Sequence, residues 1–209
     1  MKKVFVVGGS GRVATDLVAT GNEVTAGARH PEKVIKLNHV TAVELNLHDS
    51  VEKIAELMKG MDAVYFVAGS RGKDLLQTDA MGAVKTMQAA EKDGIKRYIM
   101  LSSLYALQPE MWSKIPSLAS IMDYNIAKFF ADNYLISNTK LDYTILQPAN
   151  LTEEPGTGKI QIGEGSATSN PIPDVAQTLA DILQHDNTIG HVIMMQSGNT
   201  PIEEALDQI

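Results

Sequence analysis

The sequence predicts an α/β protein built on a doubly wound parallel sheet with helices on both faces. Two observations predict this fold class. Short apolar runs, rich in β-branched residues, alternate with longer amphipathic segments along the 209 residues. The first apolar run leads directly into a glycine-rich turn, and an amphipathic segment follows. We therefore expect a three-layer α/β/α protein that binds its ligand at the carboxyl ends of the strands.

The expected strands are too short for helices and almost continuously apolar, which is typical of strands covered on both faces. They are Val4–Val7, Glu23–Ala26, Ala63–Val67, Tyr98–Leu101 and Tyr143–Leu146. The expected helices between them are Arg12–Thr20, Ser50–Lys59, Lys73–Asp93 and Asp123–Ser137. Gly94 follows the third helix, at the place where a left-handed glycine commonly ends a helix.

The last quarter of the chain begins with a different composition. From Asn150 to Pro173 the sequence is rich in glycine, proline, serine and threonine, so we expect a loop with one short strand near Lys159–Ile162. The elements expected after it are a helix over 173–183, a strand over 191–195 and a final helix. Thr200 to Glu203 form a capping box for that helix, with proline at its first position.

Composition narrows the classes of partner. Lys and Arg total 18 against 25 Asp and Glu, so the formal charge is −7, and nucleic acid is not an expected partner. Cysteine is absent, which excludes disulfides, thiol catalysis and zinc–thiolate sites. The five histidines lack metal-binding spacing, so no metal site is expected. Only four apolar residues follow Lys2 and Lys3, too few for a signal peptide or membrane span, so we expect a cytoplasmic protein with no membrane partner.

The glycine-rich turn carries the first functional signal. Gly8 would allow a tight turn, Gly11 the close approach of the backbone to a diphosphate, and Ala14 close packing of helix on strand. The first N–H groups of the following helix would face the phosphates. A merely structural turn is the alternative, but the place between a strand and a helix favours dinucleotide binding. The loop residues expected to bind it are Gly8, Gly9, Ser10, Gly11, Arg12 and Val13.

The end of the second strand distinguishes the two nicotinamide dinucleotides. An acidic residue there binds the ribose 2′-hydroxyl of NAD(H), whereas an arginine accommodates the 2′-phosphate of NADP(H). This chain has Arg29 and no acid at that place, with Arg12 as a second cation. The alternative is that Arg29 is a solvated loop residue. We expect NADP(H) to be favoured over NAD(H).

Groups suited to proton transfer follow. Ser102 and Ser103 come after the strand that ends at Leu101, and Tyr124 and Lys128 are four residues apart on one expected helix face. A neighbouring ammonium should stabilise the tyrosine phenolate and lower its pKa from about 10. Tyr124 would then exchange a proton with a carbonyl or alcohol oxygen, and Lys128 would tune it and hold the nicotinamide ribose. Taken alone, the pair could equally be an interfacial tyrosine beside a surface lysine.

One of the two serines would hydrogen-bond the reacting oxygen. Side chains alternate along a strand, so both serines cannot face the ligand if the strand continues through them. Ser103 is the expected catalytic partner of Tyr124, and Ser102 is assigned to the cofactor. A turn that begins at Leu101 would reverse this choice.

Together these residues resemble the short-chain dehydrogenase/reductase superfamily, in particular its small atypical NAD(P)-binding branch related to extended epimerase/dehydratase enzymes. The resemblance rests on the segments Val6–Gly11, Asp62–Ser70, Gly94–Ser103, Leu141–Pro148 and Asp174–Ala176. It implies a Rossmann-type fold. The contacts that it implies are adenine with Asn46 and Leu47, ribose with Ala68 and Gly69, and nicotinamide with Pro148.

The chain departs from this family in three places. Relatives commonly have arginine where Gln147 stands and often have aspartate where Asn46 stands. Extended members carry a large C-terminal substrate domain, whereas 209 − 148 = 61 residues follow Pro148 here. We expect a single domain over residues 1–209, in which about 149–209 contribute a small substrate-side region. The substrate pocket should be small or open.

The leading functional hypothesis is an NADPH-dependent oxidoreductase that acts on a carbonyl-type small molecule. A non-catalytic NADP(H)-binding redox sensor that signals through a protein partner is the alternative, and an epimerase or dehydratase is third. Tyr124 and Lys128 favour an enzyme, because a pure sensor has no chemical need for them. The chain is also compatible with a homodimer. The apolar insert between Ser103 and Tyr124 could be a lid, a partner surface or core.

Overall fold

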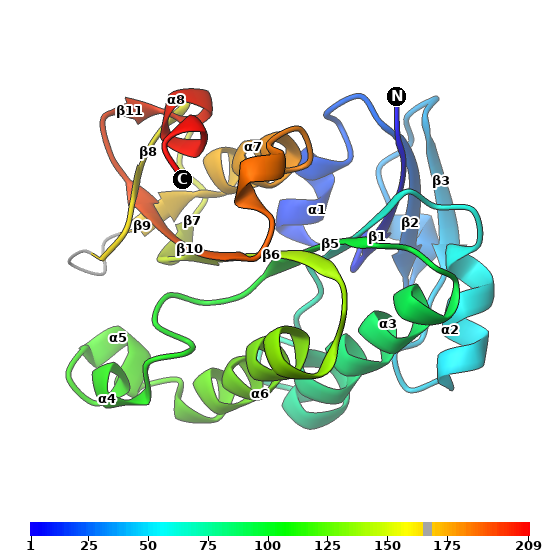
Figure 1. The fold of residues 1–209 in the computed structure, drawn as a ribbon, viewed down its shortest axis with the longest axis horizontal. Helices are drawn as coiled ribbons and strands as arrows, with labels where there is room; N and C mark the ends of the chain where they lie inside the picture. Colours follow the sequence, from blue (N-terminus) through cyan, green and yellow to red (C-terminus); the bar gives the residue numbers. More distant parts are fainter. Residues whose placement is uncertain (165–168) are drawn as a thin grey trace.

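The computed structural model describes residues 1–164 and 169–209 (Figure 1). The strands are β1 (Lys3–Val7), β2 (Glu23–Ala28), β3 (Val40–Glu44), β4 (Ala63–Phe66), β5 (Arg97–Leu101), β6 (Asp142–Pro148), β7 (Asn150–Thr152), β8 (Lys159–Ile162), β9 (Ser169–Pro171), β10 (His191–Ser197) and β11 (Thr200–Pro201). The α-helices are α1 (Arg12–Leu17), α2 (Val51–Met58), α3 (Met81–Lys92), α4 (Pro109–Trp112), α5 (Pro116–Ala119), α6 (Met122–Asn138), α7 (Ile172–Ile182) and α8 (Ile202–Asp207). Single 3₁₀ turns form η1 (Pro31–Lys33) and η3 (Asp186–Thr188), and a π-helix forms η2 (Leu75–Ala80).

Within the described residues, one nine-stranded sheet has the order β11-β8-β10-β6-β5-β4-β1-β2-β3. The strands from β3 to β10 in this order pair in parallel, and β8 pairs antiparallel with both β10 and β11. The segment β3-β2-β1-β4-β5-β6 is the doubly wound order, in which the chain reverses direction across the sheet between β1 and β4. The predicted fold class is confirmed.

The two faces of the sheet are covered by different helices because side chains alternate along each strand. In β1, Val4 and Val6 pack with α1, α7 and α8, whereas Phe5 and Val7 pack with α2, α3 and α6. Figure 1 shows these two helical layers on opposite sides of the sheet. Each such apolar side chain contributes roughly 1.5–3 kcal/mol when it is fully buried. In the described part of the chain, no helix is both long and apolar enough to cross a bilayer.

Most predicted elements lie where the sequence pattern places them. The seven expected strands coincide with β1, β2, β4, β5, β6, β8 and β10 to within a few residues, and Gly94 is left-handed with φ +71° after α3. The first helix is shorter than predicted. It ends at Leu17, because Ala19 and Thr20 donate to carbonyls only three residues back and the chain tightens into a turn.

The third predicted helix, Lys73–Asp93, is not one continuous α-helix. It begins as the π-helix η2 and becomes α3 only at Met81. The wider turn brings Thr78 and Asp79 to the interior, where Asp79 Oδ2 accepts a hydrogen bond of 3.0 Å from the Ser70 backbone N–H. This bond ties the start of the helix to the loop that leaves β4.

The predicted loop from Asn150 to Pro173 contains more structure than expected. The strands β7 and β9 pair with each other in parallel, and α7 already begins at Ile172. The part of that loop prediction at 165–168 lies outside the described residues. The predicted capping box is wrong: Thr200 belongs to β11 and pairs with Ile160, so Pro201 is the residue that precedes α8.

The apolar insert before Tyr124 forms the short helices α4 and α5 and a small core of its own. Trp112 and Leu118 are buried there with Leu104, Tyr105 and Ala149. Trp112 Nε1 donates to the Tyr105 carbonyl oxygen at 2.8 Å. Of the three alternatives for the insert, these side chains therefore support core.

Two glycines with the same backbone conformation give a stability test of the turn after β1. Gly8 has φ +91°, and an added Cβ would lie 2.6 Å from Ala68 Cα. Gly21 has φ +92°, and among the described residues nothing lies within 4 Å of its added Cβ. Gly21→Ala should cost about 1 kcal/mol of unfolding free energy, from the left-handed backbone alone. Gly8→Ala should cost at least about 2 kcal/mol more, because the backbone at Ala68 must move.

Urea unfolding of both variants and the wild type measures this difference. Equal costs for the two substitutions would contradict the close packing of the turn against Ala68.

Candidate functional site

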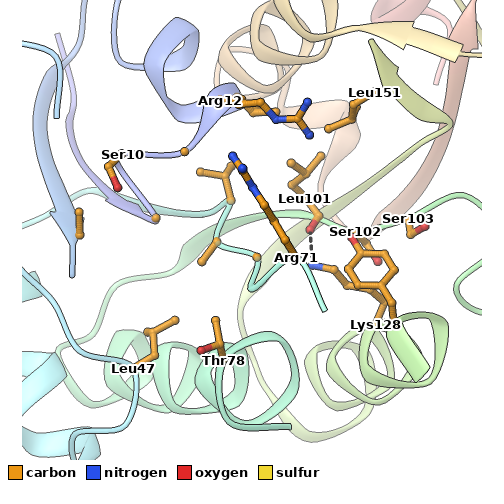
Figure 2. Close-up of a pocket in the computed structure, with 18 of the residues that line it drawn as sticks. Ser10, Arg12, Leu47, Arg71, Thr78, Leu101, Ser102, Ser103, Lys128 and Leu151 are labelled. Atoms are coloured by element: carbon orange, nitrogen blue, oxygen red, sulfur yellow. Dashed lines mark hydrogen bonds between the residues drawn. The ribbon is translucent and has the colours of Figure 1, made fainter. Parts of the chain in front are cut away.

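A cavity of about 600 Å³ opens at the carboxyl ends of the parallel strands, within the usual range for ligand sites (Figure 2). It lies where the order of the strands reverses, between β1 and β4. The predicted site residues that line it are Gly8, Ser10, Gly11, Arg12, Val13, Arg29, Asn46, Leu47, Ala68, Gly69, Ser102, Ser103, Tyr124, Lys128 and Pro148. The fold therefore brings together residues from seven separate segments of the chain.

The glycine-rich turn forms one wall of the cavity. The backbone N–H groups of Gly8 and Gly9 both donate to the Gly27 carbonyl oxygen at 2.9 Å, which holds the turn against β2. Gly27 itself must be glycine, because a Cβ would lie 2.8 Å from Leu45 Cδ2. Gly9 is buried and does not line the cavity: its added Cβ would lie 2.7 Å from Ala26 Cβ. Close packing on β2 therefore requires glycine at this position, and the cofactor contact of Gly9 stays a prediction.

Arginine side chains stand on the rim of the cavity. Arg29 is exposed at the end of β2, at the place predicted for it. Arg12 is also exposed and forms an ion pair of 2.7 Å with Glu153. Nearby, His48 Nε2 lies 2.6 Å from Asp74 Oδ2, and hydrogen bonds from Thr78 and His48 lower the pKa of Asp74.

Tyr124 and Lys128 share one face of α6, as predicted. Lys128 is only 2% exposed, and its Nζ donates to the Leu101 carbonyl oxygen at 3.2 Å (Figure 2). The same Nζ lies 5.6 Å from the ring centres of Tyr124 and Phe66. Lys128 is therefore a buried cavity residue and not a surface lysine.

The predicted fall in the pKa of Tyr124 is wrong. Removal of the ring from water raises the pKa of Tyr124, and this effect exceeds the opposing effect of the Lys128 ammonium. Asp79 and Asp132 add to the rise. The phenol is consequently held in its protonated form near neutral pH, which suits a proton donor better than a base.

The two serines after β5 differ in their surroundings. Ser102 is buried, and its hydroxyl donates to Asp132 Oδ2 at 2.7 Å. Gln147 Nε2 donates to the same oxygen at 2.9 Å. Ser103 is partly exposed to the cavity, and in the described residues its hydroxyl has no hydrogen-bond partner. This geometry leaves Ser103 free to bond a ligand and commits Ser102 to the protein.

Asp132 and Arg71 were not singled out by the sequence pattern. Asp132 is fully buried on α6, four residues after Lys128 and eight after Tyr124, so helical spacing could have indicated it. Burial raises its pKa to about 6, against the hydrogen bonds from Ser102 and Gln147. Arg71 lines the cavity from the loop after β4, and no local pattern marks it.

The residues that line the cavity fit an anionic dinucleotide. The lining includes the basic side chains of Arg12, Arg29, Arg71 and Lys128, whereas none of the described lining residues is Asp or Glu. This occurs in a chain of net charge −7, so the cations are concentrated at the cavity. Among the described residues, no group of three or more acidic or histidine side chains is placed to hold a metal ion.

Comparison with known proteins places these features in a family. The family described as NAD(P)H-binding matches residues 7–186. The oxidoreductase ylbE from Lactococcus lactis is 46% identical and has a TM-score of 0.96, covering 99% of this chain and 96% of that one. The uncharacterized sugar epimerase YhfK of Bacillus subtilis is 35% identical over 221 residues, covering 99% of this chain and 100% of the relative. A short-chain dehydrogenase/reductase of Veillonella parvula, solved in complex with NADP, shares the fold at 19% identity, with a TM-score of 0.75 over 95% of this chain and 96% of that one.

The buried carboxyl of Asp132 predicts a pH-dependent stability difference. Its pKa is raised on folding, so folding is favoured by the protonated form, and this contribution is lost as pH rises through about 6. Asparagine does not titrate. The unfolding free energy of Asp132→Asn minus that of the wild type should therefore increase by roughly 2.4 kcal/mol between pH 4 and pH 8.

Urea unfolding at five pH values measures this difference. Asp123→Asn, at an exposed position of the same helix, should follow the wild-type pH dependence. A pH-independent difference for Asp132→Asn would show that its carboxyl has an ordinary pKa.

Proposed function

The chain belongs to the NAD(P)H-binding family, and on this premise we propose that it is an NADPH-dependent oxidoreductase that reduces a carbonyl-type small molecule. One observation carries the proposal. Tyr124 and the buried Lys128 line the same cavity as the glycine-rich turn, so a dinucleotide held by that turn would reach them. The 46% identity to the oxidoreductase from Lactococcus lactis supports the reaction class.

NADPH is the proposed dinucleotide because of Arg29. Its guanidinium stands at the end of β2, where a 2′-phosphate would lie and where an acidic residue would instead select NAD(H). A guanidinium can donate two parallel hydrogen bonds to one phosphate group. The remaining contacts are assigned to Asn46 and Leu47 at adenine, and to Pro148 at nicotinamide.

The side chains on α6 and after β5 supply the proton chemistry. Bound NADPH would supply the hydride for the carbonyl carbon. Tyr124 donates its phenolic proton to the carbonyl oxygen, and its raised pKa keeps that proton in place near neutral pH. Ser103 donates a hydrogen bond to the same oxygen and stabilises the negative charge that develops there. Lys128 stabilises the phenolate that remains on Tyr124 after proton transfer.

Part of the cavity lining is uncharged. The lining includes Ile121, Ala149, Asn150 and Leu151, and none of these side chains is charged. The small core under α4 and α5 supports this wall, since Ala149 packs there with Trp112. These surroundings favour an uncharged substrate with apolar groups beside its carbonyl.

An epimerase is the second candidate. The Bacillus subtilis relative carries that name and covers nearly the whole chain. Epimerases of this kind oxidise and re-reduce one substrate without net consumption of the dinucleotide. Net NADPH oxidation with an added carbonyl compound therefore separates the two candidates.

Arg29→Ala should weaken NADPH binding by about tenfold or more and leave NADH binding nearly unchanged. The reason is that only NADPH carries the 2′-phosphate, and hydrogen bonds to a charged group contribute about 1.5–3 kcal/mol. Titration of both dinucleotides, followed by the quenching of protein fluorescence, measures the effect. Lys33→Ala, an exposed cation in η1 outside the cavity, is the matched control.

The phosphate contact at Arg29 would be contradicted if the wild type bound NADH more tightly than NADPH. It would also be contradicted if Arg29→Ala bound NADPH as tightly as the wild type does.

Tyr124→Phe should lower kcat for NADPH oxidation by about 10²-fold or more, because the general acid is removed, while NADPH still binds. The assay uses a panel of aldehydes, ketones and quinones. Tyr134→Phe is the matched control: it lies on the same helix, bonds Gln88 and does not line the cavity.

If Tyr124→Phe retains full activity on every compound that the wild type reduces, the proposed mechanism is wrong. A wild type that binds NADPH but reduces none of the panel would favour the redox-sensor alternative.

A further inference from the structure

Arg71 is a basic residue of the cavity to which the proposed function assigns no contact with the dinucleotide or the substrate. Arg29 is assigned to the 2′-phosphate, Lys128 donates to the Leu101 carbonyl, and Arg12 already pairs with Glu153. Arg71 lines the same cavity, is exposed, and forms no ion pair with any described residue. A guanidinium without an ion-pair partner, in a cavity whose described lining contains no carboxylate, is placed to receive an anion.

The backbone at Arg71 holds an unusual conformation. Its φ is +53°, in the left-handed region that side chains other than glycine and asparagine seldom adopt. The base of this loop is anchored, because the buried Asp79 carboxylate accepts from the Ser70 N–H at 3.0 Å. Gly72, which follows, has φ +79° and completes the turn. A strained residue on an anchored loop beside a ligand cavity is a common mark of a functional contact.

The side chain points toward the glycine-rich turn. Figure 2 shows Arg71 extending across the cavity toward the wall formed by Ser10 and Arg12. That wall is where the proposed function places the diphosphate of the dinucleotide. Arg71 thus faces the diphosphate position from the wall opposite Ser10 and Arg12.

We propose that Arg71 binds the diphosphate of the dinucleotide and covers it from the side opposite the glycine-rich turn. This inference rests on the proposed function. The chemistry matches, since the diphosphate carries two negative charges and guanidinium groups bind phosphate oxygens in pairs. The other source of an anion in this cavity would be an acidic substrate, and the ligands chosen below separate the two.

The test uses four ligands and the intact protein. NADPH, NADH and ADP-ribose all contain the diphosphate, whereas adenosine 2′-monophosphate lacks it. Arg71→Ala should weaken the binding of NADPH, NADH and ADP-ribose by a similar factor of about tenfold. The affinity for adenosine 2′-monophosphate should change by less than about twofold. Calorimetric titration measures the first three, and displacement of NADPH measures the fourth.

Three further variants isolate the cause. Arg71→Lys keeps the charge but not the paired donors, so it should lose part of the affinity. Arg71→Gly removes the side chain and also relieves the left-handed backbone, so it should bind as weakly as Arg71→Ala while unfolding at an equal or higher urea concentration. Lys73→Ala removes an exposed cation of the same loop that does not line the cavity, and its affinities should match the wild type.

The proposal is overturned if Arg71→Ala binds the three diphosphate ligands like the wild type, including the case in which only the KM of an acidic substrate rises. It is also overturned if adenosine 2′-monophosphate loses as much affinity as NADPH, because the loop then acts at the adenosine end. A wild type that binds none of the four ligands would instead refute the proposed function.

Discussion

The close packing at the end of β1 is the constraint on which the site depends. The N–H groups of Gly8 and Gly9 share the Gly27 carbonyl oxygen, which draws the turn onto β2. On the other side, Gly8 lies so near Ala68 that no Cβ fits between them. A single turn therefore contacts the chain at the ends of both strands that flank β1. The cavity opens at this point because the helices after β1 and β4 leave on opposite faces of the sheet.

Buried charge on α6 organises the other end of the cavity. Lys128 and Asp132 are both almost completely removed from water, one helical turn apart. Isolated buried charges are costly, so each is held by polar groups from the sheet: Lys128 by the Leu101 carbonyl, and Asp132 by Ser102 and Gln147. Gln147 donates a hydrogen bond to the Asp132 carboxyl but carries no charge. The positive charge that favours the ionised form of Asp132 therefore comes from Lys128. These contacts orient the helix face that presents Tyr124 to the ligand.

Charge is distributed unevenly over the molecule. The chain as a whole is acidic, yet the described cavity lining carries cations and no carboxylate. The basic residues attract an anionic dinucleotide to the cavity, and the acidic remainder of the protein repels it. This difference favours association of the dinucleotide at the cavity. Uncharged residues, among them Ile121, Ala149 and Leu151, line the same cavity, so it combines cationic and apolar groups.

The sequence by itself determined the features that depend on neighbours along the chain. Apolar runs located the main strands, the glycine-rich turn located the ligand edge, and a spacing of four placed Tyr124 and Lys128 on one face. Only the tertiary structure decided the π-helix η2, the pairing of β7 with β9 and the burial of Asp132. These features arise from groups far apart in the sequence, as in the bond between Ser102 and Asp132. The pKa of Tyr124 has the same origin: its lysine neighbour is visible in the sequence, but the loss of water around the ring, which outweighs that lysine, is created by packing.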